Sequence, residues 1–375
     1  MEEFLEFMRV SRQASPNTIR SYATALDRFW QHLDATAVRW DAVTLLTFLP
    51  FVIALRTGDP AGVRRLPVPG VEAGGMAEST VAVRVAAVLS FYRYHADVHQ
   101  VAVAGRLYRL GRGHRRGGYV RGLTHLDRGQ ASAQPVVKAR SASARPMPLL
   151  TPGQAAAIFD GCARVDPVTG NWSGSLRDRL LFEALAETGL RLGECLSLRH
   201  CDWRTGRGGT PFLEVVPRQD HPAGLRVKNG RYRRIYISDD LERLYSDYVW
   251  QLCEADAHRA VDLEGWQVFV NLTRGRWLAP LRAETVYDKV ATLKRQLGLA
   301  VPAGWTPHWF RHTHASALLL SGAREHVVMR RLGHADIQTT LGLYGWVTED
   351  AELRVLADWK SFSAGWRGLT ELADA

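Results

Sequence analysis

The sequence has few cysteines, no long hydrophobic run and no secretory leader. Its four cysteines, Cys162, Cys195, Cys201 and Cys253, show neither CxxC spacing nor a paired framework. We therefore expect reduced thiols, mostly in the core, rather than disulfides. No stretch approaches the roughly 18–20 consecutive apolar residues of a membrane span. The acidic first residues run straight into a helical pattern, unlike a signal peptide. These absences favour a cytoplasmic protein with no membrane partner.

The usual motifs of metal-assisted phosphate chemistry are absent as well. There is no Gly-rich phosphate loop and no carboxylate cluster for a divalent cation, which disfavours a metal-dependent nuclease. His308, His312 and His314 would permit a zinc site, because histidines four residues apart on a helix can share an ion. However, no acidic or thiol third ligand lies near them and there is no HExxH glutamate. We therefore expect neither a metal nor another cofactor.

Positive charge is concentrated in one segment of the chain. The net charge is +10, and ten Lys/Arg with a single acid, Asp127, lie between Gly105 and Pro146. Such a block favours binding to a phosphate backbone through counterion release. A solvated basic linker explains the charge equally well. The candidates for DNA contact within it are Arg112, Arg115, Arg116 and Arg121.

The hydrophobic pattern predicts a mainly α fold with a small antiparallel β-sheet, in two domains. Ser15-Pro16 is a helix start, after which apolar residues recur every three or four positions from Ile19 to Leu33. Further helices are expected over about 41–56 and 79–97, with a Pro- and Gly-rich loop between them. The expected boundaries are a helical domain over 1–104, a basic linker over 105–147, a second domain over 148–352 and a tail helix over 353–375.

The second domain is expected to combine helices with a hairpin. Thr151-Pro152 begins one helix, and the helix over 176–187 breaks at Gly189. Phe212–Val216 and Leu225–Ile237 have strand-like composition, and Asn229-Gly230 inside the second run predicts a tight turn between strands. Helices dominate again from residue 283.

Six residues of the second domain form a set suited to attack on a phosphodiester. Each one alone has an ordinary explanation as a surface or core residue, so the inference rests on the ordered set. The six are Arg191, Lys228, His308, Arg311, His334 and Tyr344.

The chemistry of these residue types is complementary. A guanidinium presents a rigid fork of donors that matches phosphate oxygens. His308 and Arg311 share a face in the first turn of a helix, where free N–H groups attract phosphate. A lysine at a turn, such as Lys228, can give a proton to a departing alkoxide. Attack by a phenolic oxygen on phosphorus stores the bond energy in a covalent intermediate, and fixed cations stabilise the developing charge.

Two further residues are expected to support the set. Glu194 lies one helical turn after Arg191 and within reach of the same site. His312 is expected to be a buried supporting histidine rather than a catalytic one.

The ordered set resembles the tyrosine recombinase (phage integrase) family. The motifs ETGLRLGE, TPHWFRHTHAS and LGHADIQTTLGLY occur in order, after a helical domain opening with SPNTIRSYATALDRF. The resemblance implies a core-binding domain followed by an α+β catalytic domain. It further implies that Tyr344 forms a 3′-phosphotyrosyl link, that Arg191 and Arg311 bind the scissile phosphate, and that Lys228 is the general acid. His308 and His334 would assist, and Glu194 would support them.

By the same resemblance, the protein would integrate and excise a mobile element through a Holliday junction without ATP or metal. Its partners would be double-stranded DNA at specific sites and three further protomers in a tetramer on synapsed DNA. The protein would be monomeric in solution and nucleoid-associated when bound to DNA in a bacterial cell, with accessory proteins left open. The runs VVPRQDHPAGLRVKNGRYRRIYI and RHTHAS look most like the transposon-encoded branch.

Two alternative functions remain open. A type IB topoisomerase uses a similar pocket but relaxes DNA as a monomer, and a catalytically silent regulator would keep only DNA binding. Retention of all six residues argues against the regulator. The expected lack of a separate arm-binding domain argues against integrases that need distant arm sites. The tail helix carries Leu353, Leu356, Trp359 and Phe362 at helical spacing, for packing on its own core or on a neighbouring protomer.

Overall fold

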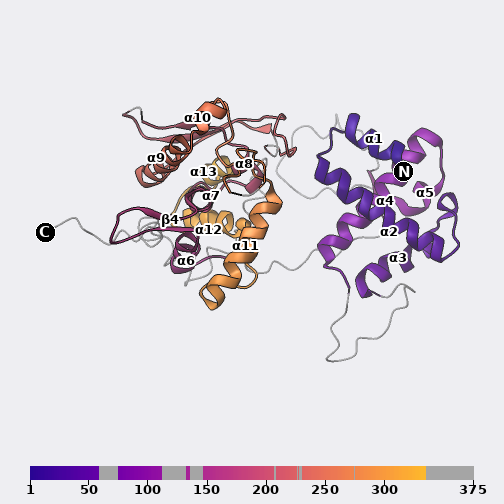
Figure 1. The fold of residues 1–375 in the computed structure, drawn as a ribbon. Helices are drawn as coiled ribbons and strands as arrows, with labels where there is room; N and C mark the ends of the chain where they lie inside the picture. Colours follow the sequence, from indigo (N-terminus) through magenta and orange to yellow (C-terminus); the bar gives the residue numbers. More distant parts are fainter. Residues whose placement is uncertain are drawn as a thin grey trace, which may run out of the picture. The chain divides into compact units, whose positions relative to one another are not determined.

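The chain divides into two units, Met1–Arg145 and Pro146–Ala375 (Figure 1). Each unit contains its own hydrophobic core. The computed structural model describes residues 1–58, 75–111, 132–135, 147–206, 208–225, 227, 230–273 and 275–334. Lys228, Tyr344, the basic residues Arg112, Arg115, Arg116 and Arg121, and the expected tail helix over 353–375 lie outside these residues.

The first unit is a small helical domain. Its helices are α1 (Glu2–Val10), α2 (Pro16–Ala35), α3 (Leu45–Thr57), α4 (Glu78–His99) and α5 (Val103–Leu107), with a 3₁₀ turn over Trp40–Ala42. Ser15 begins α2 as expected, because its side chain accepts the backbone N–H of Thr18. Phe29 lies at the centre of the core, where its ring contacts those of Phe48 and Phe51 edge-on. The three helices expected from the sequence are thus confirmed.

The start of the basic segment is more regular than its composition indicates. Leu107 is buried in the core of the first unit, three residues beyond the boundary expected at residue 104. The chain then forms β1 (Tyr108–Gly111), which pairs antiparallel with β2 (Ser132–Pro135). A short two-stranded ladder therefore lies within the segment for which the sequence predicted a linker with little regular structure.

The second unit is built around one fully surrounded helix. Its helices are α6 (Pro152–Cys162), α7 (Leu176–Thr188), α8 (Leu192–Leu196), α9 (Asp239–Glu254), α10 (Ala257–Ala260), α11 (Ala283–Leu297), α12 (Pro307–Leu320) and α13 (Glu325–Leu332). Helix α7 packs against α6, α9 and α12, and all its residues except Arg177 are buried. Thr151 begins α6 with a capping box to Gln154, as the Thr-Pro pair predicts. The central helix α7 leads directly into the candidate site.

Two small antiparallel sheets complete the second unit. Strands β3 (Ala163–Val165) and β4 (Trp172–Gly174) form a hairpin, and β5 (Trp203–Arg204), β6 (Phe212–Val215) and β7 (Arg233–Tyr236) form a sheet in that order. The prediction of mainly α structure with a small antiparallel sheet is confirmed. No helix among the described residues is both long and apolar enough to cross a bilayer.

The sequence predicted the wrong partner for the strand that ends the run Leu225–Ile237. Strand β7 pairs with β6, with Val215 opposite Arg233, and not with Leu225–Val227 across an Asn-Gly turn. The described residues between β6 and β7 contain no strand, although Gly230 does adopt a positive φ of 56°. Strands are confirmed over Phe212–Val215 and Arg233–Tyr236, but the described residues from Leu225 to Tyr232 are not in a strand. Charged cross-strand pairs between β6 and β7 fix the register.

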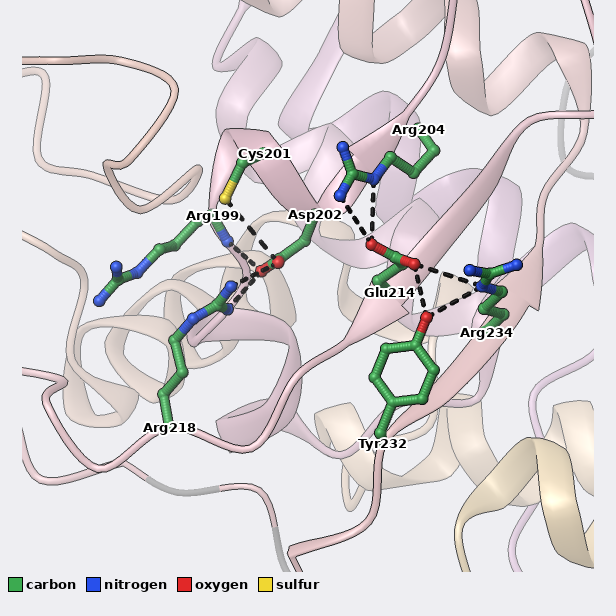
Figure 2. A network of polar contacts seen from close by, with 8 residues as sticks. All are labelled: Arg199, Cys201, Asp202, Arg204, Glu214, Arg218, Tyr232 and Arg234. Carbon is green, nitrogen blue, oxygen red and sulfur yellow. Dashed lines mark hydrogen bonds and ion pairs between the residues drawn. The ribbon is translucent and has the colours of Figure 1, made fainter.

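A buried carboxylate fixes this register. Glu214 on β6 accepts hydrogen bonds from Arg204 on β5, at 3.0 Å, and from Arg234 on β7, at 3.2 Å, and the Tyr232 hydroxyl also donates to it (Figure 2). These donors lower the pKa of Glu214, with the Tyr232 hydroxyl as the first cause. Because side chains alternate along a strand, the neighbouring Arg233 points to the opposite, buried face.

A second carboxylate ties down the chain that follows β6. Asp202 binds the guanidinium of Arg218 through two contacts of 2.6 Å and also accepts the backbone N–H of Arg199 at 2.9 Å (Figure 2). This bidentate ion pair restrains the irregular segment between β6 and β7.

Candidate active site

Arg191 occupies the junction between α7 and α8. Helix α7 ends at Gly189, whose φ of +65° is the left-handed conformation of a helix C-cap. Arg191 then adopts an extended conformation as the N-cap of α8. Its backbone N–H donates to one oxygen of Glu194 at 3.1 Å, and its Nη1 donates to the other at 2.9 Å. The Arg191 side chain keeps 22% exposure, so its guanidinium is fixed on one side and open on the other.

Glu194 is a buried charge shared by two arginines. Its side chain is 1% exposed, and its second oxygen also lies 2.7 Å from Nη2 of Arg233. Burial by itself raises the pKa of this carboxyl, but the positive charges of Arg233 and Arg191 outweigh burial and lower its pKa below the ordinary value. The carboxylate is therefore ionised at neutral pH, and the three side chains together keep one positive charge.

Arg311 joins the ends of two helices from its position on α12. The side chain is buried, and Nη1 donates to the carbonyl of Gly189 at 2.7 Å, while Nη2 donates to the carbonyl of Leu332 at 2.8 Å. These carbonyls lie at the C-terminal ends of α7 and α13, where a cation is favoured by the helix dipole. One guanidinium thus fixes the residues that precede both Arg191 and His334.

His334 follows directly after the C-cap of α13. Gly333 has a φ of +68°, and the backbone N–H of His334 donates to the carbonyl of Met329 at 3.0 Å. Burial, with the nearby charges of Arg311 and Arg191, lowers the pKa of His334 to about 4. The imidazole is therefore neutral at pH 7, with one nitrogen a donor and the other an acceptor.

His308 and His312 lie one turn apart on α12. His308 is exposed in the first turn of the helix, and its ring lies 4.3 Å from that of His312, at 76°. His312 is buried as expected, and burial lowers its pKa to about 3. His312 is therefore a neutral, buried residue that packs against the exposed His308. Among the described residues no group of three His, Cys, Asp or Glu side chains is arranged to hold a metal ion.

His314 and Arg331 form a connection that sequence reasoning missed. Nδ1 of His314 donates to the carbonyl of Ala186 at 3.0 Å, so Nε2 is free to accept from Nε of Arg331, at 2.9 Å. Arg331 also donates to the carbonyls of Glu187 and Tyr236, at 2.9 and 3.2 Å. Strand β7 and helices α7, α12 and α13 therefore meet at Arg331. The third histidine of TPHWFRHTHAS was the available signal, but the sequence offered only metal binding as its role.

Gly189 is required at this junction for two reasons, which gives a testable prediction. A Cβ at residue 189 would lie 2.7 Å from Cδ2 of His314 and 2.9 Å from Cδ2 of Leu332, in addition to the positive φ. We expect Gly189→Ala to lower the free energy of unfolding by about 2–5 kcal/mol, from backbone strain and overpacking. Gly170, with a φ of +68° and nothing within 4 Å of its Cβ position, is the matched control, for which Gly170→Ala should cost about 1–2 kcal/mol. Urea denaturation of both variants measures the difference, and equal losses would contradict the contact.

The structure brings together four of the eight residues predicted for the site. Arg191, Glu194, Arg311 and His334 act on one another electrostatically, while His308 lies one turn before Arg311 with His312 beneath it. Lys228 and Tyr344 lie outside the described residues, so their places stay predictions. One buried and one partly exposed guanidinium thus lie beside a neutral histidine at helix ends, an arrangement that can bind an oxyanion such as a phosphate.

Comparison with known families identifies the protein more closely. Residues 149–350 match the phage integrase family, and residues 1–97 match the phage integrase N-terminal SAM-like domain. The chain belongs to the phage integrase family, the tyrosine recombinases, as the sequence motifs predicted, and it is a DNA recombinase by that membership.

The relatives include a transposon-encoded transposase and tyrosine recombinases. The chain is 28% identical over 331 residues to transposase A from transposon Tn554 of Staphylococcus aureus, covering 88% of this chain and 82% of the relative. It is 25% identical over 358 residues to the tyrosine recombinase XerD of Mycobacterium tuberculosis, covering 95% and 96%.

Solved structures share the fold. The XerH site-specific recombinase bound to palindromic difH substrate superposes with a TM-score of 0.58 at 15% identity, over 93% of this chain and 82% of that one. The Tn1549 transposon integrase in complex with transposon right end DNA gives 0.57 at 16% identity, over 96% and 98%.

Proposed function

We propose that this recombinase cuts and rejoins DNA at specific sites through a 3′-phosphotyrosyl intermediate, and that it integrates and excises a mobile element. The observation that carries the proposal is the joint placement of Arg191, Arg311 and neutral His334. Two guanidiniums and an uncharged donor suit a phosphodiester monoanion that gains negative charge as a fifth oxygen approaches phosphorus.

The proposed step conserves the phosphodiester bond. The phenolic oxygen of Tyr344 attacks the scissile phosphorus and gives its proton to water, and the bond from phosphorus to the 5′ oxygen breaks. Lys228 donates the proton that converts the leaving alkoxide into a 5′ hydroxyl. The reaction exchanges a DNA phosphodiester for a phosphotyrosyl diester, so it needs no ATP. The 5′ hydroxyl of the partner strand then attacks the phosphotyrosine and releases Tyr344, which joins the two strands.

Each side chain of the site has a proposed role. Arg191 and Arg311 bind non-bridging oxygens, and His308 and His334 donate to the same phosphate. Glu194 fixes Arg191, and His312 supports His308. In this proposal, side chains alone supply the positive charge that stabilises the transition state, so the reaction needs no metal ion.

The assembly belongs to the same proposal. The predicted helical domain over 1–104 would bind one side of the DNA site, with the basic segment including Arg112, Arg115, Arg116 and Arg121 contacting phosphates. The domain over 148–352 would carry out catalysis, and the tail over 353–375 would contact a neighbouring protomer. Four protomers would exchange strands through a Holliday junction. The similarity to a Tn554 transposase supports the mobile-element role.

A nicked suicide duplex tests the chemistry directly. The duplex carries the ends of the genetic element that encodes the protein, and a nick just downstream of the cleavage site lets the short fragment with the new 5′ hydroxyl diffuse away. We expect a covalent protein–DNA adduct on a denaturing gel with EDTA present, at the same yield as without EDTA. An EDTA-sensitive adduct would refute metal independence. No adduct on duplex that is shown to be tightly bound would favour the silent DNA-binding regulator.

The products distinguish recombination from relaxation. A type IB topoisomerase would relax supercoiled circles at any sequence, whereas a recombinase yields recombinants only where its own site is present. Relaxation of plasmids that lack the site would therefore favour the topoisomerase alternative.

A further inference from the structure

Arg233 connects three elements of the candidate site without itself being one of the six predicted residues. It lies at the start of β7 with its side chain 5% exposed, and its Nη2 contacts Glu194 at 2.7 Å. Its Nε donates to the carbonyl of Arg331 at 3.0 Å. The first contact reaches the start of α8 and the second reaches the last turn of α13.

The packing of Arg233 against Gly333 is equally close. A Cβ at residue 333 would lie 2.8 Å from Nη1 and 3.0 Å from Cζ of Arg233. The guanidinium therefore lies against the peptide that immediately precedes His334, in space that only glycine leaves open. A shift of the Arg233 side chain would therefore displace the backbone of His334.

Through Glu194 the same guanidinium acts on Arg191. Glu194 uses one oxygen for Nη1 of Arg191 and the other for both Arg233 and the Arg191 backbone N–H. With Arg233 absent, the buried carboxylate would keep a single cationic partner, so the orientation of Arg191 would depend on one ion pair instead of a network.

We propose that Arg233 is a positioning residue for DNA cleavage, because it sets Arg191 through Glu194 and His334 through the C-terminal turn of α13. It does not contact the phosphate. Its place in the sequence, five residues after Lys228, lets β7 tie the segment that carries the proposed general acid to the same network. This inference rests on the proposed cleavage chemistry.

The test compares Arg233→Met with a matched buried ion pair. Arg179 pairs with Glu183 at 2.8 Å and has 9% exposure, with its other partners on α6 and β3. We measure thermal stability, the dissociation constant for a nicked suicide duplex and the single-turnover rate of adduct formation, corrected for the folded fraction. For Arg233→Met we expect adduct formation to slow about 100-fold, the size of effect typical of a misplaced catalytic group, with DNA affinity within about threefold. For Arg179→Met we expect lower stability and an unchanged corrected rate.

The pH profile separates positioning from simple scaffolding. Arg233 is one of the cations that lower the pKa of Glu194, together with Arg191, and of His334, together with Arg311 and Arg191. Removal of its charge raises both pKa values, so Glu194 and His334 become protonated at higher pH. The acid limb of the cleavage profile therefore moves to higher pH. Arg233→Lys keeps the charge but lacks the rigid fork of donors on separate nitrogens that reaches Glu194 and the carbonyl of Arg331, so it should slow cleavage while leaving the acid limb near that of the wild type.

The outcomes are distinguishable. A corrected rate and acid limb for Arg233→Met equal to those of the wild type would overturn the inference and leave the proposed function intact. If Arg233→Met does not fold, Arg233→Lys and Glu194→Gln decide by the same corrected rate. No adduct with the wild type would overturn the proposed function, and the inference with it.

Discussion

Tyr344→Phe is expected to form no covalent adduct while it binds the same duplex as tightly as the wild type. The substitution removes only the phenolic oxygen, which is the atom that would bond to phosphorus. No other group of this side chain can replace it, so we expect adduct formation to fall by at least about 10³-fold, as for loss of a catalytic nucleophile. The measurement is a denaturing gel of suicide duplex, with the dissociation constant determined in parallel.

The chain supplies a matched control for this substitution. Tyr287 on α11 is the preceding tyrosine in the sequence and is 49% exposed. Tyr287→Phe removes the same atom from the same residue type, and we expect normal adduct formation. Adduct formed by Tyr344→Phe at the wild-type rate would show that another residue is the nucleophile. Peptide mapping of the wild-type adduct would then identify that residue.

Local signals in the sequence predicted the helices well because their causes are local. Thr151-Pro152 and Ser15-Pro16 begin α6 and α2 through side-chain caps that need only three following residues. Gly189 ends α7 because only glycine adopts its conformation at little cost. The order of the family motifs likewise predicted that Arg191, Arg311 and His334 belong to one site without any tertiary information, and the structure places them near one another.

The parts that were missed depend on contacts between distant elements. The partner of β7 is fixed by Glu214 on another strand, so an Asn-Gly pair close by in sequence was misleading. Arg233 and Arg331 are not among the residues predicted for the site, yet both donate to backbone carbonyls at its edges. A buried arginine satisfied by carbonyls has no sequence signature, because its acceptors belong to the backbone and not to a residue type.

Arg311→Lys is expected to reduce both cleavage and stability. The guanidinium donates in two directions, to the carbonyls of Gly189 and Leu332, and in the proposed reaction it also binds a phosphate oxygen. An ammonium on a flexible stem cannot reproduce this planar arrangement. Loss of a donor aimed at developing charge costs about 10²–10³-fold in rate. A buried carbonyl left without its donor lowers the free energy of unfolding by about 1–3 kcal/mol.

Arg177→Lys controls for the structural part of this effect. Arg177 donates Nη1 to the carbonyl of Val270 at 2.9 Å and is paired with Asp178, so it too is a largely buried arginine bound to backbone. We expect Arg177→Lys to lose stability but to cleave at the wild-type rate once corrected for the folded fraction. Equal corrected rates for both lysine variants would show that Arg311 contributes structure alone.

A substrate with altered charge would separate the two roles of Arg311 further. A methylphosphonate at the scissile position lacks one negative oxygen, so a site with one fewer effective cation is no longer mismatched to it. Because Arg311→Lys keeps the charge, this test uses Arg311→Ala: if Arg311 neutralises the phosphate, Arg311→Ala should cleave the methylphosphonate much closer to the wild-type rate than it cleaves normal DNA. If Arg311 only joins the ends of α7 and α13, the neutral substrate leaves the defect unchanged, because the displaced carbonyls of Gly189 and Leu332 lie on the protein. Recovery on the neutral substrate would therefore assign charge neutralisation to this guanidinium, since stabilisation of the fold is the same for both substrates.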